Sequence, residues 1–243
     1  MAAFDWRMFG AVLFDLDGVI TPTASIHEHA WGELFAAFDY TEADYLAYID
    51  GKPRYDGVRS FLASRDVVLP EGDPTDPPGD DTVCAMGNRK NELFNTILAR
   101  EGIEPFAGSA ATLDLLDDLA IPAAIVSSSK NARTVLEAAG LASRFDVVVD
   151  GVVAVERHIR GKPAPDMFVE AAVELDVPVD RCVVVEDAVS GVAAGAAGGF
   201  AAVIGVDRGA GHDALLSHGA TLVVDDLAEL LPAEHDTIES TAG

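Results

Sequence analysis

The sequence is poor in several residue types, and each shortage argues against a class of protein. Its 243 residues include only two cysteines, Cys84 and Cys182. Two are too few for a disulfide framework and are typical of a reducing compartment, so we expect buried, unreactive thiols and a cytoplasmic location. Met1–Gly10 lacks the sustained apolar stretch of a secretory signal. The uncharged segment Ala188–Val206 contains five glycines and is shorter than the ~20 apolar residues of a membrane span.

Positive charge is also scarce. Lysine and arginine number 16 against 41 acidic residues, which gives a formal net charge of −25 at pH 7. A surface of this sign repels nucleic-acid phosphates and anionic lipid, so neither nucleic acid nor a membrane is expected as a partner. If the protein handles an anion, it does so at a local site that reverses this field. We expect a small-molecule partner and a monomer or weak homo-oligomer.

Apolar residues make up 49% of the chain and charged residues 23%, which is ordinary for a globular protein with one or two domains. Short apolar runs typical of strands buried on both faces alternate with amphipathic, helical patterns from about residue 110 onward. This alternation predicts an α/β fold, a Rossmann-like parallel sheet with crossover helices. The predicted strands are Ala11–Phe14, Ala123–Val126, Val147–Val149, Cys182–Val185, Ala201–Val206 and Thr221–Val224.

The stretch from about residue 24 to residue 98 departs from this alternation. It follows the first predicted strand and shows helical spacing, for example at Trp31, Leu34 and Phe38. The Pro-, Gly- and Asp-rich run from Pro70 to Asp81 interrupts it and predicts a loop that joins no packed element. We therefore expect an inserted helical domain over residues 23–99 and a core domain over residues 1–22 and 100–243. Both chain ends are expected to be loosely held, with residues 235–243 frayed.

Polar residues follow three of the predicted strands at the point where each strand ends. Asp15 and Asp17 follow the first, Ser127–Lys130 follow the second, and Glu186 with Asp187 follow the fourth. Because ligands of open α/β sheets bind at the carboxyl ends of the strands, we expect these groups to meet at one edge, together with Lys162 from a Gly-Lys-Pro loop. Four carboxylates at one edge would repel one another unless a hard cation binds there, and Mg²⁺ suits such a site.

Four segments resemble the ordered motifs of the haloacid dehalogenase superfamily of phosphotransferases. They are Phe14-Asp15-Leu16-Asp17-Gly18-Val19-Ile20-Thr21, Val126-Ser127, Gly161-Lys162-Pro163-Ala164-Pro165-Asp166 and Val185-Glu186-Asp187. Ser127-Ser128-Ser129-Lys130-Asn131 and Arg89-Lys90-Asn91 are most similar to the β-phosphoglucomutase branch. Four motifs in this order are a specific signal, whereas Asp-x-Asp alone would be weak.

This resemblance implies roles for individual residues. Asp15 would be the nucleophile that carries an aspartyl-phosphate, Asp17 the general acid and base, and Ser127 and Lys162 the holders of the transferred phosphoryl group. Mg²⁺ would be bound by Asp15, Glu186, Asp187 and the backbone carbonyl of Asp17. The helical insert would be the family's cap, which closes over the core. The expected substrate-binding residues are Thr23, His27, Arg54, Lys90, Ser128, Ser129, Lys130 and Asn131.

The four lysines of the chain support this assignment independently. Lys130 and Lys162 fall at the ligand edge of the predicted sheet, and Lys52 and Lys90 near the expected cap rim. Structural alternatives stay open: Glu186 and Asp187 could cap the next helix, Ser127–Ser129 could form a turn, and His27 could be a surface residue.

The activity that the resemblance implies is Mg²⁺-dependent interconversion of β-glucose 1-phosphate and glucose 6-phosphate through a 1,6-bisphosphate. A phosphatase on the same scaffold is the alternative. The family has Asp where Pro22 stands and Lys where Asp50 stands, and the Pro70–Asp81 run is an addition to compact members. These departures leave the phosphoryl chemistry intact and leave the choice between mutase and phosphatase open.

Overall fold

The computed structural model describes residues 4–49, 52 and 54–232, which divide into two compact units. Met1–Pro22 together with Glu104–Gly243 make up the first unit, and Thr23–Ile103 the second. The second boundary lies at Ile103 rather than at residue 99, because helix α4 (Val83–Glu101) continues past that point. Residues 235–243, for which fraying is predicted, lie outside the described residues.

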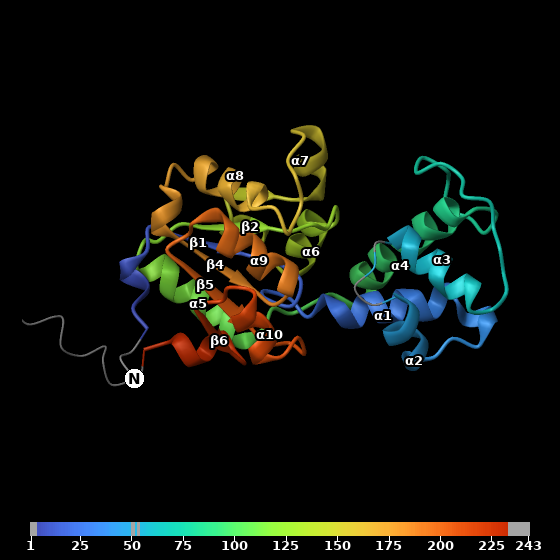
Figure 1. Ribbon diagram of the computed structural model, residues 1–243, viewed down its shortest axis with the longest axis horizontal. Coiled ribbons are helices and arrows are strands. Elements are labelled where there is room, and N and C mark those ends of the chain that lie inside the picture. The colour runs from blue at the N-terminus through green and yellow to red at the C-terminus, as the bar shows by residue number, and fades with distance from the viewer. Residues whose placement is uncertain (1–3, 50–51, 53, 233–243) are drawn as a thin grey trace, which may run out of the picture. The chain divides into compact units, whose positions relative to one another are not determined.

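Within the described residues of the first unit, six strands form one parallel sheet in the order β3-β2-β1-β4-β5-β6 (Figure 1). The central strand β1 lies between β2 and β4, with Leu13 opposite both Ala124 and Val184. All six strands lie within one residue of their predicted bounds. They are β1 Ala11–Phe14, β2 Ala123–Val126, β3 Val147–Val149, β4 Cys182–Glu186, β5 Ala202–Val206 and β6 Leu222–Val224.

Helices α8 and α9 pack on one face of this sheet, where Phe168 and Val192 join the inward residues of the strands in one buried cluster. Successive strand residues point to opposite faces, so Val12 and Phe14 are buried on the other side. No helix among the described residues is both long and apolar enough to span a bilayer. The helices of this unit are α5 Ala107–Asp118, α6 Ala132–Ala138, α7 Gly151–Glu156, α8 Asp166–Glu174, α9 Val189–Gly198 and α10 His212–Ser217.

The N-terminal segment is held more firmly than its sequence suggests. A short 3₁₀ helix, Trp6–Met8, buries the indole of Trp6. The indole N–H of Trp6 donates a hydrogen bond to the carbonyl oxygen of Leu230 at 3.2 Å, which joins the two distant ends of the described chain. The expectation of a loose N-terminus is wrong for these residues, because a buried aromatic ring with a satisfied N–H stabilises the segment.

The second unit is helical and has its own aromatic core. The ring of Phe35 lies 5.4 Å from that of Trp31 and 4.0 Å from that of Phe61. These rings are buried, as the helical spacing predicts, and they join α1 to α3. The α-helices of this unit are α1 Thr23–Leu34, α2 Glu42–Asp44, α3 Arg54–Ala63 and α4 Val83–Glu101, and a π-helix spans Tyr45–Ile49.

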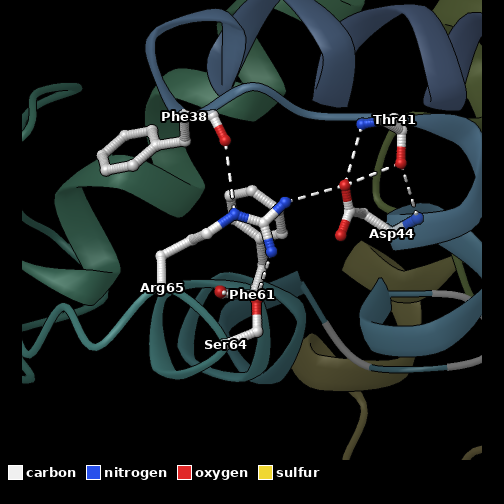
Figure 2. A network of polar contacts seen from close by, with 6 residues as sticks. All are labelled: Phe38, Thr41, Asp44, Phe61, Ser64 and Arg65. Atoms are coloured by element: carbon white, nitrogen blue, oxygen red, sulfur yellow. Dashed lines mark hydrogen bonds and ion pairs between the residues drawn. The ribbon is translucent and has the colours of Figure 1, made fainter.

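A polar network fixes the start of α2 to the end of α3 (Figure 2). The Arg65 guanidinium donates to Asp44 Oδ2 at 2.8 Å and to the carbonyl oxygen of Phe38 at 3.3 Å, and it lies 4.7 Å from the ring centre of Phe61. Asp44 Oδ2 also accepts from the backbone N–H of Thr41 at 2.9 Å. Hydrogen bonds from Arg65 and Thr41 lower the pKa of Asp44 below its ordinary value. The network therefore links the segments that lie beside the ring of Phe61 in the aromatic core.

The Pro-, Gly- and Asp-rich run from Pro70 to Asp81 is confirmed as a loop without helix or strand, and most of its residues are exposed. The backbone N–H of Val83 donates to the carbonyl oxygen of Pro70 at 2.9 Å, and that of Gly79 donates to the carbonyl oxygen of Ala85 at 3.1 Å. Asp76 Oδ2 accepts from the hydroxyl of Thr82, the N-cap of α4, at 2.8 Å. The loop joins no packed element, as predicted, but side-chain and backbone hydrogen bonds tie it to the start of α4.

Candidate active site

The carboxyl ends of three neighbouring strands, β2, β1 and β4, place Ser127, Asp15 and Glu186 along one edge of the sheet. The backbone N–H of Asp15 donates to the carbonyl oxygen of Val185 at 2.9 Å, and that of Ser127 donates to the carbonyl oxygen of Val149 at 3.0 Å. These bonds extend the pairing of β1 and β2 with their neighbours by one residue beyond the end of each strand. All three side chains are buried, which is unusual for a carboxylate without a positive partner.

Lys162 supplies that partner. Its Nζ donates to Asp15 Oδ1, to Glu186 Oε1 and, at 2.9 Å, to the carbonyl oxygen of Val126. The three N–H donors of the ammonium are thereby used on groups from three adjacent strands. Only 6% of the Lys162 side chain is exposed. The predicted convergence of Lys162 with the carboxylates is therefore present in the fold.

Burial and mutual repulsion shift the titration of this cluster. Burial raises the pKa of Asp15 well above its ordinary value; Lys162 lowers it, and Glu186, Asp17 and Asp187 raise it further. Burial and the charge of Glu186 raise the pKa of Asp187 to about 7. Burial alone would lower the pKa of Lys162, yet Asp15 and Glu186 raise it above its ordinary value. One ammonium thus faces four acidic groups, and the site favours a further cation or a proton.

Two glycines leave space for carboxylates that are expected to bind metal, those of Glu186 and Asp187. A Cβ on Gly191, at the start of α9, would lie 1.7 Å from Glu186 Oε1, and a Cβ on Gly18 would lie 2.0 Å from Asp187 Oδ2. Gly18 also has a φ of +86°, a conformation that favours glycine. Glu186 Oε2 accepts from the backbone N–H of Ala188 at 2.9 Å. Glu186 therefore bonds the residue that precedes α9 rather than one of the helix's own N–H groups, and its other oxygen accepts from Lys162.

The loop after β2 forms turns, which is the structural alternative to a binding role that the sequence left open for Ser127–Ser129. Ser127 Oγ accepts from the N–H of Ser129, and Ser129 Oγ accepts from the N–H of Asn131, both at 3.1 Å. Asn131 is the N-cap of α6 but its side chain makes no capping bond there. Lys130 and Ser128 are exposed on the core unit. Within the described residues the structure brings Asp15, Glu186 and Lys162 into direct contact, and Ser128–Asn131 stay predictions.

The substrate residues predicted from the insert lie in the second unit. His27 is half-buried, with its ring stacked 4.5 Å from that of Phe94, and its Nδ1 contacts Lys90 Nζ. Burial and the Lys90 charge lower the pKa of His27 to about 3. His27 is therefore packed against Phe94 and Lys90 while staying partly exposed, and Lys90 is interior rather than on a rim. Thr23 is buried at the start of α1, and Arg54 begins α3.

Sequence analysis missed one residue that supports the site. Arg208 Nε donates to the carbonyl oxygen of Gly18 at 2.9 Å, and its guanidinium carbon lies 3.8 Å from the ring centre of Phe106. It therefore holds the backbone loop that carries Asp17. Nothing in the spacing could have indicated it, because 190 residues separate the two partners.

Comparison with known proteins decides the family. Residues 9–199 match the haloacid dehalogenase-like hydrolase family. The chain belongs to this family. It is 48% identical to the β-phosphoglucomutase of Mycobacterium bovis, with 91% of each chain covered, and 33% identical to hexitol phosphatase A of Escherichia coli, with 77% and 78% covered. Among solved structures, a haloacid dehalogenase family hydrolase from Deinococcus radiodurans with bound phosphate and sodium is 32% identical, with a TM-score of 0.70 and 92% and 94% covered.

Proposed function

We propose that this family member is a Mg²⁺-dependent sugar phosphomutase that interconverts β-glucose 1-phosphate and glucose 6-phosphate. The observation that carries the proposal is the buried contact of Asp15 with Lys162 at the carboxyl edge of the sheet. A carboxylate held there can accept a phosphoryl group while the ammonium offsets its charge. The 48% identity to a β-phosphoglucomutase over 91% of both chains supports the mutase proposal. The two buried free cysteines of the chain fit a cytoplasmic enzyme.

The donor set fits Mg²⁺. Asp15, Glu186 and Asp187 offer carboxylate oxygens, and the carbonyl of Asp17 offers one more, which is the oxygen-only set that a hard cation takes. The raised pKa values of Asp15 and Asp187 indicate negative charge in excess of what Lys162 offsets. When bound, Mg²⁺ would neutralise charge on the phosphoryl oxygens.

In the first step of the proposed reaction an oxygen of Asp15 forms a bond to the phosphorus on O1 of glucose 1,6-bisphosphate as the bond from that phosphorus to O1 breaks, and glucose 6-phosphate leaves. Asp17 gives its proton to the departing O1. In the second step the 6-hydroxyl of an incoming β-glucose 1-phosphate attacks the aspartyl-phosphate and gives its proton to Asp17. Lys162 and Ser127 hold the phosphoryl oxygens in both steps. The 1,6-bisphosphate is thereby formed again, and Asp15 returns to its starting form.

The second candidate is a phosphatase, in which water replaces the sugar hydroxyl in the second step. The 33% identity to a hexitol phosphatase supports it, as does Pro22 where the mutase pattern has Asp. Asp50, the other departure, lies outside the described residues.

One experiment separates the two candidates. The protein is incubated with β-glucose 1-phosphate, Mg²⁺ and a catalytic amount of glucose 1,6-bisphosphate. We expect glucose 6-phosphate as the product; free glucose with inorganic phosphate would identify a phosphatase instead. Asp15→Asn should abolish turnover, because an amide cannot form the acyl-phosphate. The exposed Asp118→Asn on α5 is the matched control and should retain full turnover.

A further inference from the structure

The carboxamide of Asn88 joins the Pro70–Asp81 loop to the side chain of Arg54. Its Nδ2 donates to the carbonyl oxygens of Asp76 at 2.8 Å and Pro74 at 3.1 Å. Its Oδ1 accepts from the Tyr55 hydroxyl at 2.9 Å and from Arg54 Nη2 at 3.3 Å. An amide has two N–H donors and an oxygen with two lone pairs, so these four bonds satisfy Asn88 completely.

This saturation fixes the direction of the amide. Rotating it by 180° would turn its NH₂ toward the Arg54 guanidinium, which has only donors, and its oxygen toward two carbonyl oxygens. The loop carbonyls therefore dictate that Oδ1 points at Arg54. The position of the Arg54 guanidinium in turn depends on a loop that begins sixteen residues later in the chain.

Gly87 leaves space on α4 for the ring of Tyr55, which bonds both Arg54 and Asn88. A Cβ on Gly87, inside helix α4, would lie 2.5 Å from the Tyr55 ring. A glycine in a helix interior is less favourable than an alanine. Here it lets the ring lie against α4, with the Arg54 guanidinium carbon 5.0 Å from the ring centre and Arg54 Nη2 3.2 Å from the Tyr55 hydroxyl.

Arg54 and Asn88 border an open hollow of about 680 Å³ on the second unit. Other residues lining it, Asn91, Asn95 and Thr96, come from one face of α4. Asn95 Oδ1 is buried and has no hydrogen-bond partner within the described part of the chain. Asp76 and Glu92 also line the hollow, so it is the Arg54 guanidinium that suits it to an anion. The amides of Asn91 and Asn95 and the unsatisfied Asn95 acceptor suit hydroxyl groups, and together these groups fit a sugar phosphate.

We propose that Asn88 is a positioning residue for substrate recognition: it holds the Arg54 guanidinium ready for the second phosphate of a sugar bisphosphate, with the Pro70–Asp81 loop as its anchor. The inference rests on the proposed function for the identity of the ligand. It makes the loop part of the recognition apparatus rather than a passive connection. Asn88 acts through Arg54 and not on the reacting phosphoryl group.

The first test measures how firmly the Arg54 side chain is held, and it does not require enzymatic turnover. In the full chain, the NMR order parameter of the Arg54 Nε–H bond is compared between wild type, Asn88→Leu and the control Thr96→Ala. Thr96 is exposed on the same helix, and its hydroxyl donates to the carbonyl oxygen of Glu92 at 2.9 Å. We expect the order parameter to fall below about 0.6 in Asn88→Leu alone. An unchanged value in Asn88→Leu would overturn the inference.

The second test is a double-mutant cycle with Arg54→Ala. Asn88→Leu should raise the concentration of glucose 1,6-bisphosphate needed for half-maximal activity about tenfold and change kcat less than twofold. Turnover of a small aryl phosphate, which has no second phosphate, should stay within twofold. In the Arg54→Ala background Asn88→Leu should add nothing, because the residue through which it acts is gone. Full additivity of the two effects would refute the proposal.

Two further outcomes are decisive. If Asn88→Leu does not fold, Tyr55→Phe is used instead: it removes the hydroxyl that donates to Asn88 and accepts from Arg54, and it keeps the Asn88 amide. The concentration of glucose 1,6-bisphosphate needed for half-maximal activity should then rise about threefold, and an unchanged value counts against the inference. If wild type turns over no sugar phosphate, the proposed function fails, while the order parameter still decides whether Asn88 positions Arg54.

Discussion

At the residue scale, the behaviour of the site depends on one ammonium among four acidic groups. The raised pKa of Lys162 means that it stays protonated throughout the working pH range, so it cannot act as a base. Its role is to offset the charges of Asp15 and Glu186, which it contacts directly. In the proposed reaction, proton transfer therefore falls to a carboxylate, and we assign it to Asp17, which is only partly buried.

Replacing Lys162 by Met should damage both folding and activity. The substitution keeps the length of the side chain but leaves two buried carboxylates without a partner, which costs about 3–5 kcal/mol when a buried pair is broken. We expect the metal-free protein to lose stability on this scale in urea unfolding, and phosphoryl transfer to fall at least about 10³-fold. Lys52→Met, at an exposed position, is the control. Equal stability of the two variants would contradict the prediction.

Mg²⁺ binding should depend on pH through Asp187. Its pKa is raised to about 7, so below that pH the folded, metal-free protein holds a proton that the ion must displace. We expect apparent Mg²⁺ affinity to rise up to about tenfold per pH unit toward pH 7 and then level off, as measured by calorimetry. The same raised pKa means that metal-free stability falls as pH rises from about 4 to about 7, because ionisation is disfavoured only in the folded state. An affinity that is flat across this range would exclude Asp187 as the titrating group.

At the scale of elements, glycines without a side chain let helix α9 lie close to the sheet and to Glu186. Gly191 lets the helix start beside the Glu186 carboxylate, and Gly195 meets Val184 and Val203 of the sheet. The glycine content of Ala188–Val206, which argues against a membrane span, has its structural counterpart here. These small residues serve close packing of the helix on the strands.

Gly191→Ala should therefore displace Glu186 and weaken Mg²⁺ binding by about tenfold, the size of effect that supporting residues of metal sites have. Gly32→Ala on α1 is the matched control, because nothing lies within 4 Å of the position that its Cβ would take. That control should raise the unfolding free energy by about 0.5–1 kcal/mol, since alanine is the better helix former. Calorimetric titration and thermal unfolding measure the two effects. Unaltered Mg²⁺ affinity in Gly191→Ala would mean that Glu186 is not a ligand.

At the scale of the whole molecule, the excess of negative charge acts on stability as a general repulsion. A formal charge of −25 on 243 residues repels itself in the folded state, and salt screens that repulsion. We expect Tm, with Mg²⁺ absent, to rise by a few degrees as NaCl increases from about 10 mM to about 0.5 M. KCl should give the same rise. A falling Tm would indicate that attractive pairs such as Arg65 with Asp44 outweigh the repulsion.

The sequence by itself was sufficient for the strands, the insert and the main carboxylates. Each strand is a short apolar run between glycines or polar residues, and its pattern is local, so its bounds are correct to within one residue. Asp15, Glu186 and Lys162 were predictable together because strand ends of a parallel sheet share one edge. The family match over residues 9–199 agrees with the motifs that carry these residues.

Only the tertiary structure decided what depends on contacts between distant segments. The docking of Trp6 on Leu230, the support of Gly18 by Arg208 and the anchoring of the Pro70–Asp81 loop through Asn88 all join residues far apart in the chain. The burial of Lys90 belongs to the same class, because a lysine is expected at the surface. Local patterns carry no information about such pairings, since they form only when the chain has folded.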